Sequence, residues 1–243
     1  MLKIVNWNIN GGYLIKNNST TNNFQFFIDK IKIINPDIVL IQEGHINSKL
    51  NQIEELSKEL DLKYYVFQGL GESHIEKGNQ LCLFILSRFK LENVEFKEIK
   101  IPYFEKYNGR FNSILKSDLH KKGFLKAEIL FDNNINTIIC AHGHALYLFD
   151  KSLDDLPLQK KESINFILKN HENLIFGADM NYDKLLQIKK IQNKFSSAFK
   201  NEKTYKNKEN DYILLSKKIK IINQKLDYCT DDHPLMYVEV EVK

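Results

Sequence analysis

The sequence predicts an α/β fold, and three features of the chain indicate it. Short apolar runs that are typical of buried strands recur along the chain, and residues 174–176 (Leu-Ile-Phe) form one of them. Stretches with apolar residues at helical spacing lie between these runs, beginning with residues 20–35. The length of 243 residues, with 43% hydrophobic and 27% charged residues, allows a sizeable core, and the sequence shows neither a linker-like stretch nor an internal repeat. We therefore expect a single domain over residues 1–243.

The N-terminal half alternates strands with helices. Residues 2–7 alternate apolar and polar side chains, as a strand does. Residues 20–35 place five apolar side chains on one helical stripe, and Pro36 ends this helix. Residues 37–42 form a continuous apolar run, so both faces of this strand should be covered. The other elements expected in this half are a helix at 51–62 and strands at 64–67, 81–87 and 94–101.

The C-terminal half begins with a hairpin. Strands at 124–131 and 135–140 flank the turn-forming residues 132–134 (Asp-Asn-Asn). Helical spacing of apolar residues predicts helices at 157–170 and 185–195. The stretch 174–181 begins as a buried strand, and the remaining expected strands are 211–216, 219–226 and 235–242.

Polar side chains stand at the ends of these strands. Asp179 and Asn181 follow a buried strand two positions apart, so in an extended segment they point to the same side. This pair could hold a water, a metal or a phosphate oxygen, although turns also use Asp and Asn freely. Similar strand-end positions hold Asn8, Glu43, His142, Asp211, Asp232 and His233. Carboxylates gathered in this way are costly without a counter-charge, and a hard divalent cation with oxygen ligands supplies one.

The three cysteines take no part in this set. Cys82, Cys140 and Cys229 show neither the spacing of a metal site nor that of a disulfide framework. They are typical of buried thiols in a reducing compartment. We expect no signal peptide, because the sequence runs directly into its first strand, and no apolar run is long enough to span a membrane. These features favour a soluble cytoplasmic protein.

The charge balance is mildly basic, with a net charge of +4. This fits a polyanionic partner, but a general enrichment in Lys, Asn and Ile would give the same balance. Residues 102–122 form a long polar connection in which Arg110, Lys121 and Lys122 alternate with aromatic residues. Such a segment suits a nucleic-acid backbone and its bases, and it also suits a solvated hairpin extension.

Seven short motifs then occur in order along nearly the whole chain. They are Asn6-Trp7-Asn8, Ile41-Gln42-Glu43, Ile85-Leu86-Ser87-Arg88, His142, Gly177-Ala178-Asp179-Met180-Asn181, Asp211-Tyr212-Ile213-Leu214 and Asp232-His233-Pro234. This ordered set resembles the endonuclease/exonuclease/phosphatase superfamily, which is also called deoxyribonuclease-I-like. The resemblance implies a four-layered α/β sandwich of two packed, mainly antiparallel sheets with helices outside.

The resemblance also implies an activity, namely the Mg²⁺-dependent cleavage of a phosphoester by in-line attack of water. Mn²⁺ is expected to substitute for Mg²⁺. By match to the motifs, Glu43 is similar to the principal metal ligand of the family, with Asn8 beside it and Asp232 nearby.

The catalytic roles follow from the same match. Asp179 resembles the residue that orients or deprotonates the water, and Asn181 resembles the one that holds a phosphate oxygen. Asp211 would orient His233, which would contact the scissile phosphate. His142 stands where the family places a His or Tyr near the leaving group.

The remaining candidate residues do not determine which substrate the protein acts on. His144 could take the place of His142 if the strand were two residues longer, and it joins Arg110, Lys121 and Lys122 as an expected substrate contact. Gly44-His45 stands where apurinic-site endonucleases tend to carry Thr-Lys, which puts abasic-site specificity in doubt. Ala178 and Asn210 are further departures from the family pattern, and neither removes a catalytic group.

We expect a monomeric nuclease acting on DNA or RNA. The alternatives are a phosphatase or phosphodiesterase for a small or lipid substrate, an enzyme similar to tyrosyl-DNA phosphodiesterases, and a domain of this fold that only binds. The intact set of polar residues argues against a domain that only binds. No exposed aromatic hairpin suits a bilayer, which counts against a lipid substrate.

Overall fold

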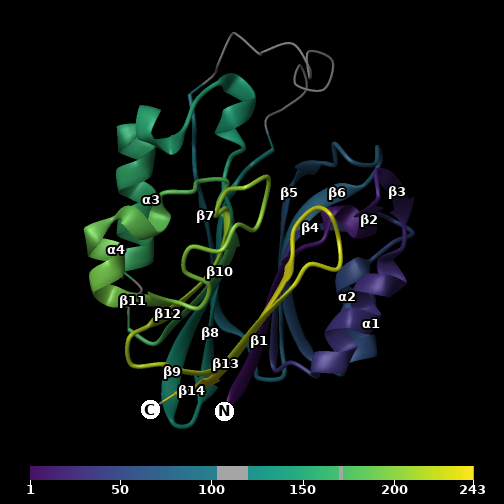
Figure 1. The fold of residues 1–243 in the computed structure, drawn as a ribbon. Helices are drawn as coiled ribbons and strands as arrows, with labels where there is room; N and C mark the ends of the chain where they lie inside the picture. Colours follow the sequence, from purple (N-terminus) through teal and green to yellow (C-terminus); the bar gives the residue numbers. More distant parts are fainter. Residues whose placement is uncertain (103–119, 170–171, 243) are drawn as a thin grey trace.

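Two β-sheets pack face to face, and helices cover both outer faces (Figure 1). The computed structural model describes residues 1–102, 120–169 and 172–242. Helices α1 and α2 lie outside one sheet, and α3 and α4 lie outside the other. The predicted four-layered α/β sandwich is thereby confirmed.

The first sheet has the strand order β13-β14-β1-β4-β6-β5. Strands β1 and β4 are parallel, and every other neighbouring pair in this sheet is antiparallel. The strands are β1 (Leu2–Asn8), β4 (Ile38–Ile46), β5 (Tyr64–Glu72), β6 (Gln80–Ser87), β13 (Lys220–Asp227) and β14 (Leu235–Glu241), and the covering helices are α1 (Phe24–Ile34) and α2 (Gln52–Leu60).

The second sheet has the order β11-β12-β10-β9-β8-β7. Only β9 and β10 are parallel in it. Its strands are β7 (Glu92–Glu98), β8 (Gly123–Phe131), β9 (Asn134–His142), β10 (Leu174–Asp179), β11 (Phe195–Ser197) and β12 (Asp211–Ser216), and its helices are α3 (Pro157–Lys169) and α4 (Lys189–Lys194). The predicted hairpin of β8 and β9 is confirmed, with both strands slightly longer than expected.

Three apolar clusters hold the layers together. One lies between the sheets and includes Leu40 and Ile175, which are fully buried. The second packs α3 and α4 on the second sheet, and the third packs α1 and α2 on the first, with Phe27 and Ile31 of α1 buried in it. Burying each large apolar side chain contributes about 1.5–3 kcal/mol, so the sheet alternation and the helix stripes together determine the layers.

The first predicted helix begins later than expected. A short hairpin of β2 (Tyr13–Lys16) and β3 (Ser19–Asn22) occupies the region before it, with Asn17 and Asn18 at φ 52° and 60° in the turn. Helix α1 starts at Phe24, where Asn23 caps it by accepting a hydrogen bond from the Phe26 amide. The apolar stripe itself begins at Phe24, and polar residues 17–23 carry turn and cap signals that the prediction passed over.

The predicted helix at 185–195 is also different. Residues Leu185–Gln187 form one turn of 3₁₀-helix, α4 covers Lys189–Lys194, and Phe195 opens the short edge strand β11. Ile191 and Phe195 are buried in the same apolar cluster, so their spacing satisfied the helical pattern although the chain between them changes conformation.

Strand direction brings the chemically active residues to one end of the molecule. The parallel strands β1 and β4 end there, and so do the parallel strands β9 and β10. Both chain termini lie at the opposite end in Figure 1. Among the described residues, no helix has the length and apolar character needed to cross a membrane.

Candidate active site

Three predicted site residues lie side by side across three strands of the second sheet. Asp179 ends β10, and its backbone pairs with His142 of β9 on one side and with Asp211 of β12 on the other. All three side chains are buried. The His142 Nε2 atom is 3.5 Å from the Asp179 Oδ2 atom. Sheet register alone therefore places two carboxylates and an imidazole in a row.

His233 completes this row from the segment before β14. Its Nδ1 atom is 2.9 Å from Asp211 Oδ2, and its Nε2 atom is 3.7 Å from Asp179 Oδ2. The His233 carbonyl accepts hydrogen bonds from the Trp7 indole and the Thr230 hydroxyl, both at 2.9 Å, which fix this segment. Burial opposes a charge on the imidazole, but the Asp211 and Asp179 carboxylates outweigh it and raise the pKa of His233 well above its ordinary value.

Two residues that the sequence did not single out support this pair. The Thr204 hydroxyl accepts hydrogen bonds from the Asn210 and Asp211 amides, at 3.2 and 2.9 Å, and so anchors the start of β12. The Tyr205 ring stacks on the His233 ring, with centroids 4.5 Å apart and planes 2° apart. A Thr-Tyr pair seven residues before a strand is too common a pattern to have indicated these contacts.

Glu43 enters the site from the first sheet. It lies within β4 at a register shift between Ile41 and Gly44, so the strand continues to Ile46 and does not end at Glu43 as predicted. Its φ of 59° is rare for a residue other than glycine and re-aims the side chain, as bulges beside active sites do. The Glu43 Oε1 atom lies 3.5 Å from His142 Nε2.

Lys122 lies inside the site. It is 7% exposed, and its Nζ atom is 2.9 Å from Nδ1 and 3.0 Å from Nε2 of His142 and 3.8 Å from Glu43 Oε1. Burial lowers the pKa of this ammonium, while Glu43 and Asp179 act in the opposite direction. Lys121 next to it is exposed, and its amide donates to the Leu70 carbonyl. Arg110 lies outside the described residues.

Asn8 joins the two sheets at the centre of the site. Its amide nitrogen donates a 3.0 Å hydrogen bond to Asp179 Oδ2, and its Oδ1 atom accepts one from the Asn10 amide. Burial raises the pKa of Asp179 to about 7, and the Asp211 and Glu43 carboxylates act in the same direction, against His233 and Asn8. Asp179 therefore binds protons near neutral pH in the metal-free protein.

The acidic residues of the site fit a divalent cation. Burial raises the pKa of Asp232, as it does for Asp179, and the neighbouring Glu43 and Asp211 carboxylates act in the same direction, against the His233 and Lys206 cations. Among the described residues, Asp179, Asp211 and His233 each place a ligand atom within 4.8 Å of the others. Asp211 and His233 already bind one another. Asp232 lies beside them, with its Oδ1 atom 3.9 Å from His233 Nε2. Glu43, Asp232 and the Asn8 amide oxygen are further groups that could hold a cation with oxygen ligands.

The remaining predicted residues lie at the margin of the site. The side-chain amide nitrogen of Asn181 donates to the Gly143 carbonyl at 3.3 Å. The His144 Nε2 atom is 2.7 Å from the Ile99 carbonyl oxygen, and burial lowers the pKa of this imidazole to about 4. His142 therefore faces the acidic group, and His144 is held by a backbone carbonyl elsewhere.

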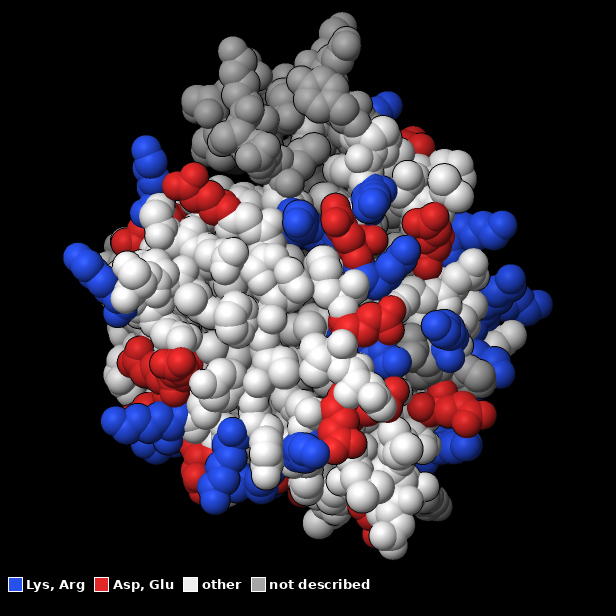
Figure 2. Space-filling model, turned by 180° about the vertical axis from the view of Figure 1, so that it is seen from behind, with Lys and Arg blue, Asp and Glu red and all other residues white. Residues whose placement is uncertain are grey.

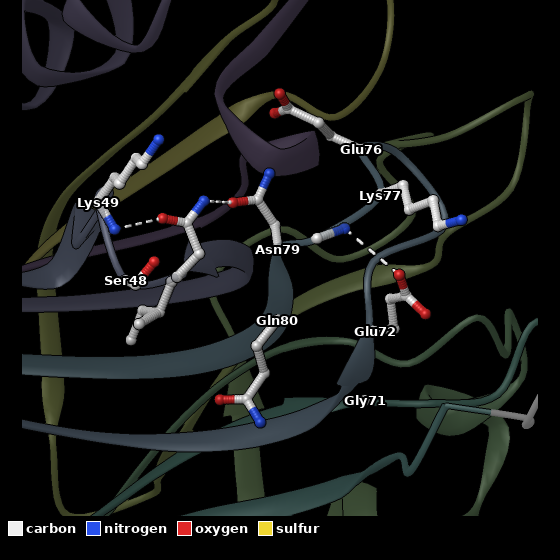
Figure 3. A pocket seen from close by; sticks show the side chains of 11 residues that line it. Ser48, Lys49, Gly71, Glu72, Glu76, Lys77, Asn79 and Gln80 are labelled. Atoms are coloured by element: carbon white, nitrogen blue, oxygen red, sulfur yellow. Dashed lines mark hydrogen bonds between the residues drawn. The ribbon is translucent and has the colours of Figure 1, made fainter.

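A pocket of about 690 Å³ opens beside the β5–β6 hairpin and the segment after β4 (Figure 3). Lys49 and Lys77 lie on opposite sides of it, and Glu72 and Glu76 also line it. None of the predicted site residues lines it. Its two lysines and two glutamates offset each other, so it offers a polyanion no net attraction.

The sequence matches no protein-family model and no curated protein. Its structure is similar to a solved endonuclease/exonuclease/phosphatase from Beutenbergia cavernae, with a TM-score of 0.72 at 13% identity over 99% of this chain and 71% of that one. It is also similar to D. rerio TDP2 complexed with a single-strand DNA product (TM-score 0.62, 14% identity, 99% of both chains). A 3′ phosphatase from Neisseria, NExo, bound to a product DNA hairpin, gives 0.58 at 13% identity over 99% of this chain and 100% of that one. The chain has the endonuclease/exonuclease/phosphatase fold.

Proposed function

We propose that this protein is a Mg²⁺-dependent phosphodiesterase, and specifically a nuclease that hydrolyses DNA or RNA phosphodiester bonds by in-line attack of water. The observation that carries the proposal is the convergence of Asp179, Asp211 and His233 beside Glu43 in one buried group. Buried acids and a charged histidine are costly to keep together, and their perturbed pKa values are typical of a catalytic site.

Glu43, Asp232 and Asn8 would hold the cation. Carboxylate and amide oxygens are the ligands that Mg²⁺ prefers. When bound, the ion supplies positive charge against the developing charge on the phosphoryl group and the leaving oxygen. The raised pKa of Asp232 supports this assignment, because a cation there would relieve the repulsion among the acids.

The chain's own residues account for the proton and for orientation. Asp179, with a pKa near 7, is suited to accept a proton from the attacking water at its Oδ1 or Oδ2 atom. The charged His233 would donate Nε2–H to a phosphoryl oxygen, and Asp211 fixes the ring by accepting from Nδ1. Asn181 would add a neutral donor once its side chain leaves the Gly143 carbonyl.

Lys122 and His142 would act together on the other side of the phosphoryl group. Burial lowers the pKa of His142 well below its ordinary value, and Lys122 and His233 lower it further. A neutral His142 can accept from the Lys122 ammonium and orient it between Glu43 and the substrate. The buried ammonium then offers its other hydrogens to a phosphoryl oxygen near the leaving group.

The similar structures support nucleic acid as the substrate. TDP2 and NExo were each solved with a DNA product, and the net charge of +4 favours a polyanion. A second candidate is removal of a terminal phosphate, because the NExo structure is that of a 3′ phosphatase. The catalytic groups serve both reactions, so the loops around them decide between the two.

A substrate panel tests the proposal. The purified protein with Mg²⁺ is incubated with plasmid, single-stranded DNA, RNA and a set of phosphomonoesters. We expect cleavage of a nucleic acid, its loss in EDTA and its recovery with Mg²⁺ or Mn²⁺. Glu43→Gln should raise the Mg²⁺ concentration needed for half-maximal rate while circular dichroism stays unchanged. Full activity in EDTA would contradict the metal assignment, and turnover of phosphomonoesters alone would favour the second candidate.

A further inference from the structure

The two six-stranded sheets have four edge strands, and three of them carry features that block further pairing. Edge strand β13 contains Lys220, Lys225 and Asp227 together with a register shift. Edge strand β7 has four charged residues among seven and a register shift of its own, and β11 is only three residues long. Charge, bulges and shortness are the means by which proteins protect a sheet edge.

The fourth edge, β5, has little of this protection. Residues 64–71 (Tyr-Tyr-Val-Phe-Gln-Gly-Leu-Gly) contain neither charge nor proline, and the register shift lies at the far end, between Gly69 and Gly71. Tyr64, Tyr65 and Phe67 are 42%, 36% and 47% exposed. A broad area without Lys, Arg, Asp or Glu is visible from behind the molecule (Figure 2), and β5 is the rear strand of its sheet in Figure 1.

The outer side of β5 is partly closed by the chain itself. Among the described residues, β6 is the one strand that pairs with β5, and the Lys121 amide donates to the Leu70 carbonyl at the register shift. This contact ends the stretch that a new strand could use. The stretch runs from Tyr64 to Gln68 and is centred on Val66.

In place of the monomer that we expected from the sequence, we propose that β5 of a second copy of this chain pairs antiparallel with this stretch across a two-fold axis at Val66. The first sheets of the two copies would then form one continuous sheet. Under that symmetry Tyr65 of each copy lies opposite Phe67 of the other, and Tyr64 lies opposite Gln68. Tyr65 and Phe67 face the same side of the sheet, since they pair with Leu86 and Phe84 of β6, so the aromatic pair forms twice.

Charge and length both select this occupant. Lys63 of each copy falls opposite Gly69 of the other, so no like charges face each other and the lysine meets no side chain. The register uses the whole stretch from Tyr64 to Gln68 and stops before the point where Lys121 closes the edge. The interface is isologous, and one substitution therefore acts twice.

Sedimentation velocity of the full chain over a range of concentrations tests the pairing. We expect a concentration-dependent dimer, whose dissociation constant rises at least ~10-fold in Phe67→Lys and Tyr65→Lys. Val94→Lys is the matched control, because Val94 lies on edge β7 and is 49% exposed. It should leave the dimer unchanged. A wild-type protein that stays monomeric at every concentration, including one that instead binds a foreign extended peptide at β5, would overturn the proposal.

Cross-linking tests the register independently of stability. In a Cys229→Ser background, Val66→Cys should form an intermolecular disulfide under mild oxidation, because the two-fold axis places this residue opposite its own counterpart, with the Cβ atoms within bridging range, and both Tyr65–Phe67 pairs are kept. Tyr65→Cys alone should cross-link far less, since its counterpart is then diagonal. Equal cross-linking of the two variants would exclude a two-fold axis at Val66, and failure of both would exclude the pairing.

Discussion

The two buried histidines of the site differ in charge although they lie in one cluster. His233 is 5% exposed and His142 is 1% exposed, so burial acts against the cation in both. Asp211 lies 2.9 Å from His233, and the pKa of this imidazole is raised. The Lys122 ammonium lies 2.9 Å from His142, and the pKa of that imidazole is lowered first by burial and then by Lys122. The neighbouring charge, rather than burial, therefore sets which histidine carries a proton.

This difference divides the site into two sides. On the His233 side, the fixed charge is on an imidazole, and a carboxylate orients it. On the His142 side, the basic group is the buried Lys122 amine, whose pKa is lowered by burial, and it lies 2.9 Å from an imidazole whose pKa is lowered as well. Each side places one basic group near Asp179, and the proposed phosphoryl substrate, with charge on several oxygens, would use both.

The largest expected effect comes from breaking the His233 side. His233→Ala removes the group that would meet the phosphate and should lower kcat/KM by on the order of 10²–10⁴-fold. Asp211→Asn should lower kcat/KM somewhat less, because the imidazole remains but loses the carboxylate that orients it and favours its charged form. The kcat/KM of the double variant should be little lower than that of His233→Ala, since the effects of substituting residues that act as a unit are not additive.

A double-mutant cycle on kcat/KM at saturating Mg²⁺ measures this coupling, with circular dichroism to confirm folding. Losses that multiply would mean that the two residues work independently. In that case the 2.9 Å contact between them would be structural, and His233 would need another source of orientation.

A smaller effect is expected on the His142 side. Lys122→Gln removes a charged donor and should lower kcat/KM by about 10–100-fold, the range that corresponds to one charge-assisted hydrogen bond. Because Lys122 is buried, this loss should be the same at low and high salt. Lys121→Gln is the matched control: an exposed lysine that contacts a phosphate should change the salt slope of nucleic-acid binding by about one unit.

The informative result is the difference between Lys122→Gln and Lys121→Gln in kcat/KM and in salt dependence. If Lys122→Gln lowered the salt slope and spared kcat, the ammonium would be an ordinary backbone contact. If neither variant altered the salt dependence, a small phosphate substrate would be favoured over nucleic acid.

The contrast between Lys121 and Lys122 also marks a limit of the sequence. The family resemblance carried by the order of the motifs predicted the sandwich. The apolar runs predicted the strand ends that carry Asp179 and Asp211, because alternation and apolar runs are local patterns. It did not predict which of two adjacent lysines points inward, since that depends on where β8 begins at Gly123. The stacking of Tyr205 on His233 was also missed, because it joins residues from two loops whose meeting no local pattern encodes. The fold and the positions of Asp179 and Asp211 could thus be predicted from the sequence, whereas the contacts that shift the pKa values of the site could not.

The smallest expected effect is on the stability of the metal-free protein. It measures what burying the Asp179 carboxylate costs the folded state, separately from any effect on catalysis. Burial raises the pKa of Asp179 from 3.8 to about 7 in the folded protein. Between these values the folded state binds a proton that the unfolded state has lost, so the free energy of unfolding of the metal-free protein should fall as pH rises through this window.

Asp179→Asn should remove this dependence, because asparagine has the same shape and no charge to bury. At pH 8 in EDTA the variant should therefore melt higher than the wild type, by roughly 2–4 °C for each kcal/mol recovered, while at pH 4 the two should melt alike. Differential scanning calorimetry across this range measures the difference, and Asp132→Asn in the exposed β8–β9 turn is the control that should leave it unchanged. Adding Mg²⁺ should raise the wild type at pH 8 more than the variant, since the cation offsets the charge that only the wild type carries. A variant that melts lower than the wild type at pH 8 would mean that the Asp179 carboxylate stabilises the fold. The burial of this acid would then have a structural role, and its raised pKa would not indicate a cost of building a catalytic site.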